Sequence, residues 1–233
     1  LADGTVRVAV DLMEVERAAK TLLKNGCEAV CLFFINGYAN PKNEKKAAES
    51  LRKIWPNEHV SVATEILPEI REFERCSTTT LNAYLQPPVA NYLARIEDRI
   101  KEKNKTTEIL IVQSNGGVMS IETAKSRPIK TALSGPAAGV VAAREIASAA
   151  GFNNIITGDM GGTSFDVSLV ANGQNMLTAQ ANIDFGMTIR TPMIEMTTIG
   201  AGGGSIAKID KTGFLEIGPE SAGSDPGPVC YGL

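Results

Sequence analysis

The stretch Asp159-Met160-Gly161-Gly162-Thr163-Ser164-Phe165-Asp166 predicts a tight hairpin, and the fold is built outward from it. Ile155 and Ile156 precede this stretch and Val167 to Val170 follow it, so a buried strand runs into the loop and a second strand returns. The two adjacent glycines allow the backbone to turn tightly and to present bare N–H groups to an anion. The stretch therefore predicts an anion-binding turn at the carboxyl end of a strand.

Two kinds of side chain in this hairpin favour phosphate chemistry. Thr163 and Ser164 add hydroxyl donors for anionic oxygens. Asp159 and Asp166 offer the oxygen ligands that a phosphate-bound Mg²⁺ takes, and Asp159 would hold the ion directly or through water. An ordinary tight hairpin with a capping aspartate is the alternative interpretation, because short glycine motifs match often by chance. A Walker loop is disfavoured, since it needs a lysine and a following helix.

Outside the hairpin, helical and strand patterns alternate along the chain. Asp11 and Glu14 form a capping-box pattern at the start of a helix that Asn25-Gly26 ends. Further helices are predicted from Pro41 to about Trp55 and from Pro68, the latter interrupted by serines and threonines and resumed over Val89 to Lys103. Strands are predicted over Ala29–Ile35, which reads as buried on both faces, and over Val60–Thr64 and Glu108–Gln113.

The second half of the chain is richer in glycine. Ser134 reads as the N-cap of a helix over Ala137 to Ala150, and Asn172-Gly173 predicts a two-residue hairpin. A glycine loop is expected over Gly200–Ser205 and a tail of turns over Gly218–Gly232. Alternating strands and helices indicate an α/β protein with a partly parallel sheet, and the change in composition places a domain boundary near residues 130 to 136.

Composition excludes several classes of protein. The chain has 233 residues and a formal net charge of −3, which is not the charge of a generally basic nucleic-acid-binding protein. Apolar runs are too short for a membrane helix, and the first residues lack the pattern of a secretion signal. The four cysteines and single histidine suit neither a disulfide scaffold nor a zinc site. We therefore expect a cytoplasmic protein that binds neither nucleic acid nor membrane.

Several segments together resemble one family. The hairpin resembles the second phosphate-binding hairpin of the actin, sugar-kinase and Hsp70 ATPase superfamily. More narrowly, the chain resembles the hydantoinase A and 5-oxoprolinase family, whose relatives include an acetone carboxylase subunit. The other segments that carry the resemblance, in family order, are Glu74–Leu85, Gln113–Gly117, Leu133–Val140, Thr198–Ala207 and Gly218–Pro228.

The resemblance implies a fold and an activity. The fold would be two actin-like (ribonuclease H-like) ATPase domains truncated at both ends, with the first over residues 1–133 and the second over 134–233. Family members carry a first phosphate hairpin upstream and an adenosine segment downstream, so the chain would be the middle of a longer subunit, and the isolated fragment would be inactive. That subunit would use ATP and Mg²⁺ to open hydantoin or 5-oxoproline by phosphorylating the amide oxygen, with a second hydantoinase-type subunit as partner.

The resemblance also assigns roles to residues. Asp159 and Asp166 would be catalytic, with Asp159 orienting Mg²⁺, and the cofactor-binding residues would be Gly161, Gly162, Thr163 and Ser164. Weaker candidates for the substrate or phosphate side are Asn115, Gly116, Gly202, Gly203 and Gly204. For these the alternatives are a glycine-rich turn and a close approach of two segments.

Two other functions remain open from the sequence. One is an ATP-dependent ketone carboxylase subunit, and the other is a nucleotide-binding assembly module without turnover. Arg71 and Arg75, four residues apart with Glu72 and Glu74 nearby, are expected on a solvated helix face.

Overall fold

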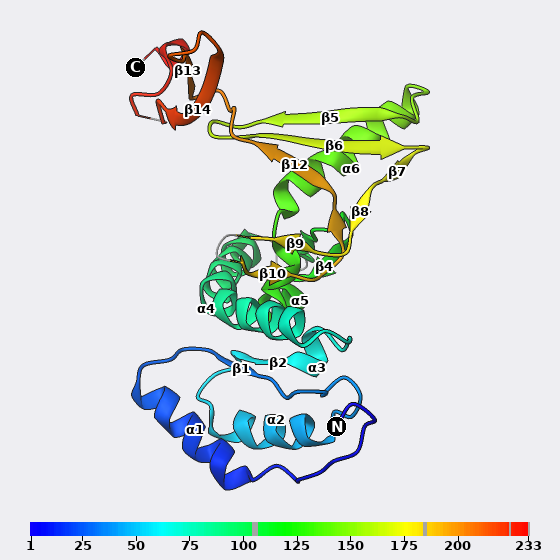
Figure 1. The fold of residues 1–233 in the computed structure, drawn as a ribbon, viewed down its shortest axis with the longest axis vertical. Helices are drawn as coiled ribbons and strands as arrows, with labels where there is room; N and C mark the ends of the chain where they lie inside the picture. The colour runs from blue at the N-terminus through cyan, green and yellow to red at the C-terminus, as the bar shows by residue number, and fades with distance from the viewer. Residues whose placement is uncertain (104–106, 184–185, 224, 233) are drawn as a thin grey trace. The chain divides into compact units, whose positions relative to one another are not determined.

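The computed structural model describes residues 1–103, 107–183, 186–223 and 225–232, and the chain forms two compact units (Figure 1). The first unit contains residues 1–113, 117–132 and 179–192, and the second contains 114–116, 133–178 and 193–233. The protein is a mixed α/β protein, and the assignment of residues 1–133 and 134–233 to two actin-like domains stays a prediction. Ser224, in the last of the resembling segments, lies outside the described residues.

The first unit begins with a parallel β–α–β arrangement. Strand β1 (Val30–Leu32) pairs in parallel with β2 (Val60–Val62), and helix α2 (Lys42–Ile54) connects them. Helix α1 (Leu12–Lys24) begins at Asp11, whose side chain accepts a hydrogen bond from the Met13 amide, and ends at Asn25 as expected. The strand expected over 29–35 is shorter and only partly buried, because the chain leaves the pairing after Leu32 and Ile35 is exposed.

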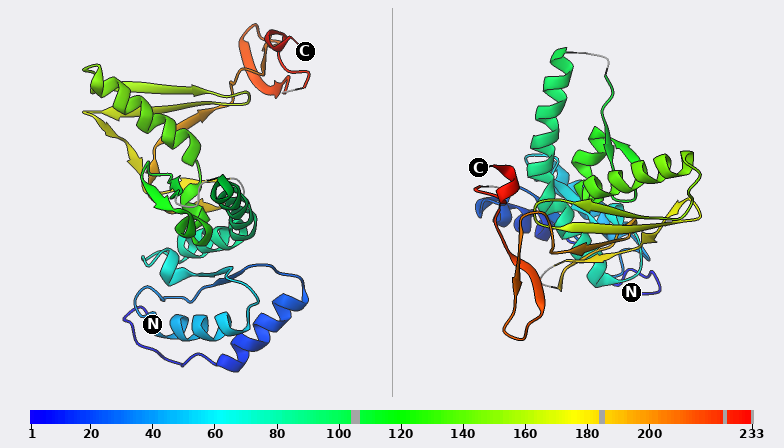
Figure 2. Two further views of the ribbon diagram at one scale, coloured as in Figure 1. Left: turned by 180° about the vertical axis from the view of Figure 1, so that it is seen from behind. Right: turned by 90° about the horizontal axis from the view of Figure 1, so that it is seen from above.

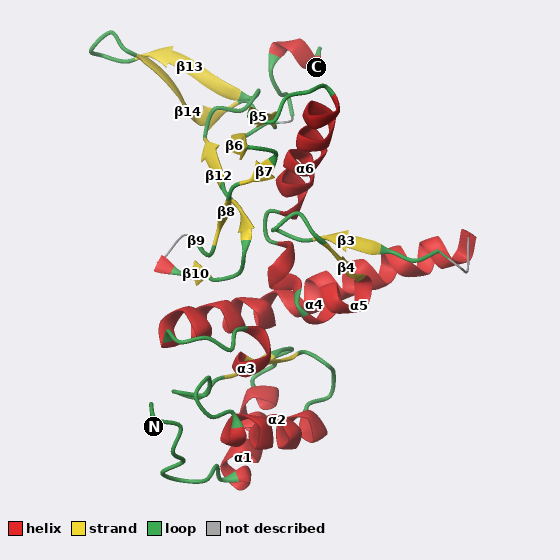
Figure 3. Ribbon diagram, turned by 90° about the vertical axis from the view of Figure 1, so that its right-hand side faces the viewer, coloured by secondary structure: helices red, strands yellow, loops and turns green. Residues whose placement is uncertain are grey.

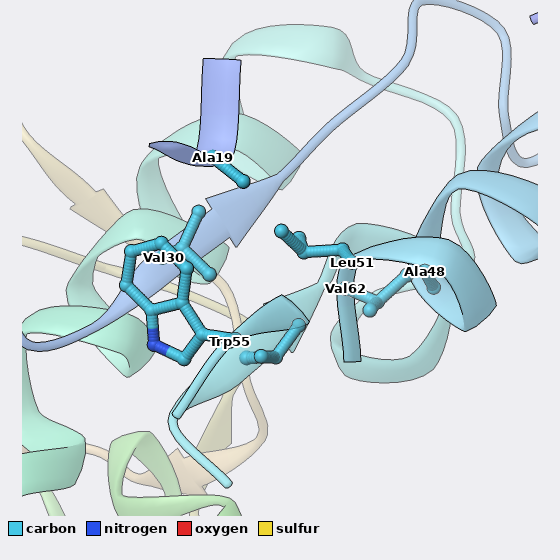
Figure 4. Packing of buried hydrophobic residues seen from close by; sticks show 7 residues of the cluster. Ala19, Val30, Ala48, Leu51, Trp55 and Val62 are labelled. Atoms are coloured by element: carbon cyan, nitrogen blue, oxygen red, sulfur yellow. The ribbon is translucent and has the colours of Figure 1, made fainter. Parts of the chain in front are cut away.

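A cluster of apolar side chains joins these elements (Figure 4). Ala19 of α1, Leu51 of α2 and Trp55 at the end of α2 pack with Val30 and Val62 of the two strands. Each of these side chains is at most 7% exposed, so the parallel pair is covered by both helices. The sequence signals for α2, Pro41 before it and Trp55 after it, are confirmed.

Helix α4 corrects two expectations about the middle of the chain. It runs without interruption from Glu72 to Lys103, through the serine and threonine stretch (Figure 3). The helix tolerates this stretch because its hydroxyls have partners: Thr79 Oγ1 donates to the Arg75 carbonyl at 2.7 Å, and Thr78 Oγ1 accepts from the Arg190 amide at 2.9 Å. Arg75, expected at the surface, is completely buried and bonds to Glu72 at 2.7 Å.

The remaining elements of the first unit are short. Strand β3 pairs with β4 and β9 pairs with β10, both in antiparallel register. The other remaining elements are the short helices α3 and α5 and one 3₁₀ helix. Their bounds are α3 (Ala63–Ile66), β3 (Leu110–Val112), β4 (Val118–Ser120), α5 (Ile121–Ser126), a 3₁₀ helix (Pro128–Thr131), β9 (Ala181–Asn182) and β10 (Thr188–Ile189). Among the described residues, no helix is both long enough and apolar enough to cross a membrane.

The second unit is built on a four-stranded antiparallel sheet of order β12-β6-β5, in which β7 (Gln174–Asn175) also pairs with β6, and helix α6 packs on one face (Figure 2). The strands are β5 (Ile155–Met160), β6 (Phe165–Ala171) and β12 (Met196–Ile199), and α6 spans Ser134–Ala149. Ser134 lies inside this helix, and its N-cap is Leu133 with φ +62°, so the capping expectation was wrong by one residue. The expected turn at Asn172-Gly173 is confirmed, with positive φ at both residues.

Short strands complete the second unit. They are β7 (Gln174–Asn175), β8 (Leu177–Thr178), β11 (Met193–Ile194), β13 (Ser205–Ile209) and β14 (Leu215–Ser221), followed by a 3₁₀ helix (Val229–Tyr231). Strands β13 and β14 pair in an antiparallel hairpin, so the tail expected to be all turns begins with ordered strand. Strand β5, expected to be buried, is largely exposed, with Ile156 at 73%.

Candidate functional site

The predicted hairpin forms at the junction of β5 and β6. The Gly161 amide donates to the Ser164 carbonyl at 2.9 Å and closes a four-residue turn. Just before and after this turn, Asp159 of β5 lies directly opposite Asp166 of β6 in the antiparallel register. Side chains of directly opposed residues share one face of a sheet, so the two carboxylates are cross-strand neighbours.

A third polar side chain extends this pair across the sheet. Thr198 of β12 is opposite Asp166 in the register, and its Oγ1 donates to Asp166 Oδ1 at 2.6 Å. The row Asp159, Asp166 and Thr198 therefore crosses the strands β5, β6 and β12 on one face. The hydrogen bond fixes one oxygen of Asp166, Oδ1.

The two carboxylates border a cavity of about 470 Å³ within the second unit. Small and apolar residues of α6 line one side, with Gly139, Val140 and Ala143 among them, and β5 and β6 line the other. Thr157 and Ser168 add hydroxyls to its wall. The cavity is thus apolar along the helix and acidic at the end where the hairpin begins.

The glycine loop before β13 packs directly on the hairpin. Its amides donate to three successive hairpin carbonyls: Gly202 to Thr163 at 3.2 Å, Gly203 to Gly161 at 2.9 Å and Gly204 to Gly162 at 2.8 Å. These three loop amides are therefore satisfied inside the protein rather than pointed at a ligand. The contact favours the interpretation of the loop as a close approach of two segments.

The hairpin itself keeps its donors. Among the hydrogen bonds of the described residues, none uses the amide of Gly162, Thr163 or Ser164 as donor, nor either hydroxyl. Gly162 and Thr163 are exposed, and a Cβ on Gly162 would meet no atom within 4 Å. Unpartnered, accessible N–H groups on consecutive residues are what a phosphate group needs, so the hairpin fits one.

The carboxylates fit Mg²⁺ under one condition. Within the described part of the chain, no group of three or more histidine, cysteine, aspartate or glutamate side chains could hold a metal ion. Asp159 and Asp166 could supply two oxygens at most, and Mg²⁺ commonly binds through one or two carboxylates, water and substrate phosphates. The donor set suits Mg²⁺ that arrives with a phosphate ligand.

Asn115 and Gly116 lie elsewhere in the second unit. They follow Ser114, which is 1% exposed and whose carbonyl accepts from the Ile194 amide at 2.8 Å. Gly116 has φ +83°, and a Cβ there would meet Val141 Cγ2 at 2.7 Å. Neither Asn115 nor Gly116 is among the described residues that line the cavity, so their assignment to a substrate or phosphate stays a prediction.

Thr198 was missed as a member of the site. Its contact with Asp166 depends on the pairing of β12 with β6, which are separated by more than twenty residues. In the segment Thr198–Ala207 the sequence indicated a family resemblance and candidate glycines, but no role for Thr198. A strand register set by distant residues leaves no local signal in the sequence.

Comparisons with known proteins identify relatives over the whole chain. The family model described as hydantoinase/oxoprolinase matches residues 75–233, and the model of the hydantoinase/oxoprolinase N-terminal region matches residues 1–55. The chain is 37% identical to caprolactamase subunit alpha of Pseudomonas jessenii, over all of this chain and 33% of that protein. It is 34% identical to the acetophenone carboxylase gamma subunit of Aromatoleum aromaticum, over all of this chain and 32% of that protein.

Two solved structures are similar as well. The crystal structure of an ATP-dependent caprolactamase from Pseudomonas jessenii matches with a TM-score of 0.84 at 37% identity, covering all of this chain and 33% of that chain. A nucleotide-free structure of acetone carboxylase, which performs ATP-dependent acetone carboxylation, matches with a TM-score of 0.72 at 28% identity, covering 90% of this chain and 30% of that chain. The chain thus spans about a third of the length of these relatives.

Proposed function

The chain belongs to the hydantoinase/oxoprolinase family, and we propose on this basis that it supplies the phosphate-binding hairpin of an ATP-dependent enzyme subunit. The reaction would open a cyclic amide, such as a hydantoin, 5-oxoproline or a related lactam. The observation that carries the proposal is the turn Gly161–Ser164, with three unpartnered amides next to two opposed carboxylates. Caprolactamase subunit alpha is about three times longer than this chain, and in a subunit of that length the remaining parts of the nucleotide site would lie outside this chain.

Each residue of the hairpin would have a separate task. The amides of Gly162, Thr163 and Ser164, with the Thr163 and Ser164 hydroxyls, would hold phosphate oxygens and offset negative charge that develops during transfer. Gly161 would close the turn and keep it free of a side chain. Asp159 and Asp166 would hold Mg²⁺, directly or through water, and Thr198 would orient Asp166.

ATP would supply the phosphoryl group that activates the amide oxygen of the substrate. Activation is needed because an unstrained five-membered amide is a poor electrophile toward water. The role of this chain would be confined to binding the phosphates and the metal ion. The ring of the substrate and the adenosine would be recognised by other parts of the subunit or by a partner subunit.

A partner subunit is part of the proposal. Caprolactamase alpha and acetophenone carboxylase gamma are each named as subunits, which supports assembly with at least one different chain. Among the described residues of this chain, nothing identifies the docking surface. The assay of function therefore requires the full-length subunit together with its partner.

The second candidate function is ATP-dependent carboxylation of a ketone. The similarity to acetophenone carboxylase and acetone carboxylase supports it, since both share the same segment. In that case the same hairpin would serve activation of a ketone enolate. A nucleotide-binding module without turnover is the third, and no comparison favours it.

A product assay on the full-length subunit with its partner distinguishes these functions. Phosphate release is measured with hydantoin, 5-oxoproline or caprolactam, and in parallel with acetone or acetophenone plus bicarbonate. We expect ring-opened product in proportion to phosphate, and at least about a tenfold lower rate in Asp159→Asn. Carboxylated ketone instead would establish the second function. ATP binding with no turnover of either substrate class would refute both.

A further inference from the structure

Three consecutive peptide groups of the hairpin are held by their carbonyls. The carbonyls of Gly161, Gly162 and Thr163 accept hydrogen bonds from the loop segment Gly202–Gly204, at 2.8 to 3.2 Å. In regular strand the carbonyls of successive residues point to opposite sides. Here three in a row face the same loop, so the backbone of the turn is curved toward it.

This curvature fixes the direction of the unused amides. The peptide bonds that follow Gly161, Gly162 and Thr163 are trans, and in a trans peptide the N–H points opposite to the C=O. Because all three carbonyls face the loop, the N–H groups of Gly162, Thr163 and Ser164 all point away from it. The loop and the anion site thus occupy opposite sides of the same three peptide groups.

The close approach requires glycine at one position above all. A Cβ on Gly202 would lie 2.5 Å from the Thr163 carbonyl carbon, 2.6 Å from the Ser164 nitrogen and 2.7 Å from the Gly162 carbonyl carbon. All three atoms belong to the backbone, so no side-chain rotation relieves the overlap. The same atoms form the peptide groups whose amides face the proposed phosphate.

The space available for an added Cβ differs between the other glycines of the loop. A Cβ on Gly204 would lie 3.0 Å from Ser221 Oγ and 3.1 Å from the Gly162 carbonyl oxygen, whereas a Cβ on Gly200 would meet nothing within 4 Å. Ser221, the last residue of β14, and the following Ala222 also bind the loop. The Ala222 amide and Ser221 Oγ both donate to the Gly204 carbonyl, at 2.7 and 3.2 Å. The loop is therefore fixed on both sides.

We propose that the segment Gly202–Gly204 is a positioning clamp that aligns the amides of Gly162, Thr163 and Ser164 for a phosphate group, and that Gly202 is its critical residue. The inference rests on the proposed function of the hairpin. The clamp touches no ligand and acts through the backbone of the turn. Donors aligned before binding need no reorganisation when the anion arrives, which strengthens binding.

The test compares three alanine variants of the full-length subunit with its partner. Calorimetry measures the affinity for Mg²⁺-ATP and, separately, for adenosine, which has no phosphate. We expect Gly202→Ala to weaken Mg²⁺-ATP binding by at least about tenfold, because hydrogen bonds to a charged group are lost or misaligned. Gly204→Ala should fall between the other two, and Gly200→Ala should stay within about twofold of the parent protein.

Adenosine separates positioning from general damage. A clamp acting on the phosphate site alone leaves adenosine affinity unchanged, whereas a collapse of the domain weakens both ligands. Equal Mg²⁺-ATP affinity in Gly202→Ala and Gly200→Ala, with weakening in Asp159→Asn, would overturn the clamp while leaving the proposed function intact. Absence of Mg²⁺-ATP binding in the parent protein would overturn both. If Gly202→Ala does not fold, the milder Gly204→Ala decides between these outcomes by the same comparison.

Discussion

Loss of Arg75 should destabilise the first unit far more than loss of its buried partner Glu44. Both side chains are completely buried, with Arg75 Nη2 3.7 Å from Glu44 Oε2. Arg75→Leu leaves the Glu44 carboxylate buried with only two backbone donors, from the Phe34 and Thr64 amides at 3.0 and 2.6 Å. An uncompensated buried charge typically costs about 3 to 5 kcal/mol of stability.

Glu44→Gln should cost less, about 1 to 2 kcal/mol, because the amide keeps one acceptor and Arg75 retains Glu72 at 2.7 Å. The double variant should lose less free energy of unfolding than the two single variants together, by about 1 to 3 kcal/mol. Removing both charges leaves neither of them unpaired. The measurement is urea unfolding followed by fluorescence of Trp55, the only tryptophan of the chain and 4% exposed in the same unit.

The matched control is Arg17→Leu. Arg17 pairs with Glu14 at 3.4 Å on an exposed face of α1, with side chains 78% and 68% exposed. Removing this pair should change stability by less than about 1 kcal/mol. If the effects of Arg75→Leu and Glu44→Gln are additive, or if Arg75→Leu destabilises no more than the control, the two buried charges do not depend on each other.

Three further predictions concern other contacts. Thr198→Val should weaken Mg²⁺-ATP binding several-fold in calorimetry, because Asp166 Oδ1 loses the hydroxyl that donates to it at 2.6 Å. Unchanged affinity would show that this hydrogen bond does not orient Asp166. Hydrogen bonds from two lysines lower the pKa of Glu97 from 4.5 to about 2, so its stabilising contribution is present above pH 4.5 and is lost as pH falls toward 2. Urea unfolding at a series of acidic pH values should thus show a shallower loss of stability for Glu97→Gln than for the parent, and parallel curves would contradict this. Gly158→Ala should lower the melting temperature of the second unit, because the added Cβ would lie 2.7 Å from the Phe165 ring. An unchanged melting temperature would mean that the ring can move aside without cost.

Local signals in the sequence predicted several elements of this fold. The caps at Asp11 and Asn25-Gly26, Pro41 before α2 and the turn at Asn172-Gly173 each act within a few residues, and each is confirmed. The hairpin of β5 and β6 was predicted for the same reason, because its glycines determine where the chain can turn.

Predictions from the sequence were wrong where contacts between residues far apart in the sequence determine the structure. The hydroxyls of Thr78 and Thr79 have partners that keep α4 continuous, and one of those partners, Arg190, is more than a hundred residues away. Arg75 is buried because Glu44, the Leu67 carbonyl and the Phe33 ring surround it, although its own helix neighbours suggest an exposed face. The residues next to Thr78 and Arg75 in the sequence do not indicate these contacts.

The hairpin was predicted from the sequence and the packing of the glycine loop on it was not, while the roles of the hairpin residues stay predictions. The amides of Gly162 to Ser164 and the opposed carboxylates Asp159 and Asp166 belong to one continuous stretch of the sequence. The packing of Gly202–Gly204 on that stretch depends on the path of the chain through β12, and glycine content alone could not distinguish a ligand loop from a close approach.

Mg²⁺-ATP calorimetry on the full-length subunit, beside Asp159→Asn and Asp166→Asn, tests the phosphate and metal site most directly. With Mg²⁺ present, each variant should bind ATP at least about tenfold more weakly, because a metal ligand is lost. Without Mg²⁺, the variants should bind ATP no more weakly than the parent, since removing a carboxylate removes repulsion toward the phosphates. Parent-like Mg²⁺-ATP affinity in folded Asp159→Asn and Asp166→Asn would contradict the account and return the hairpin to a structural role.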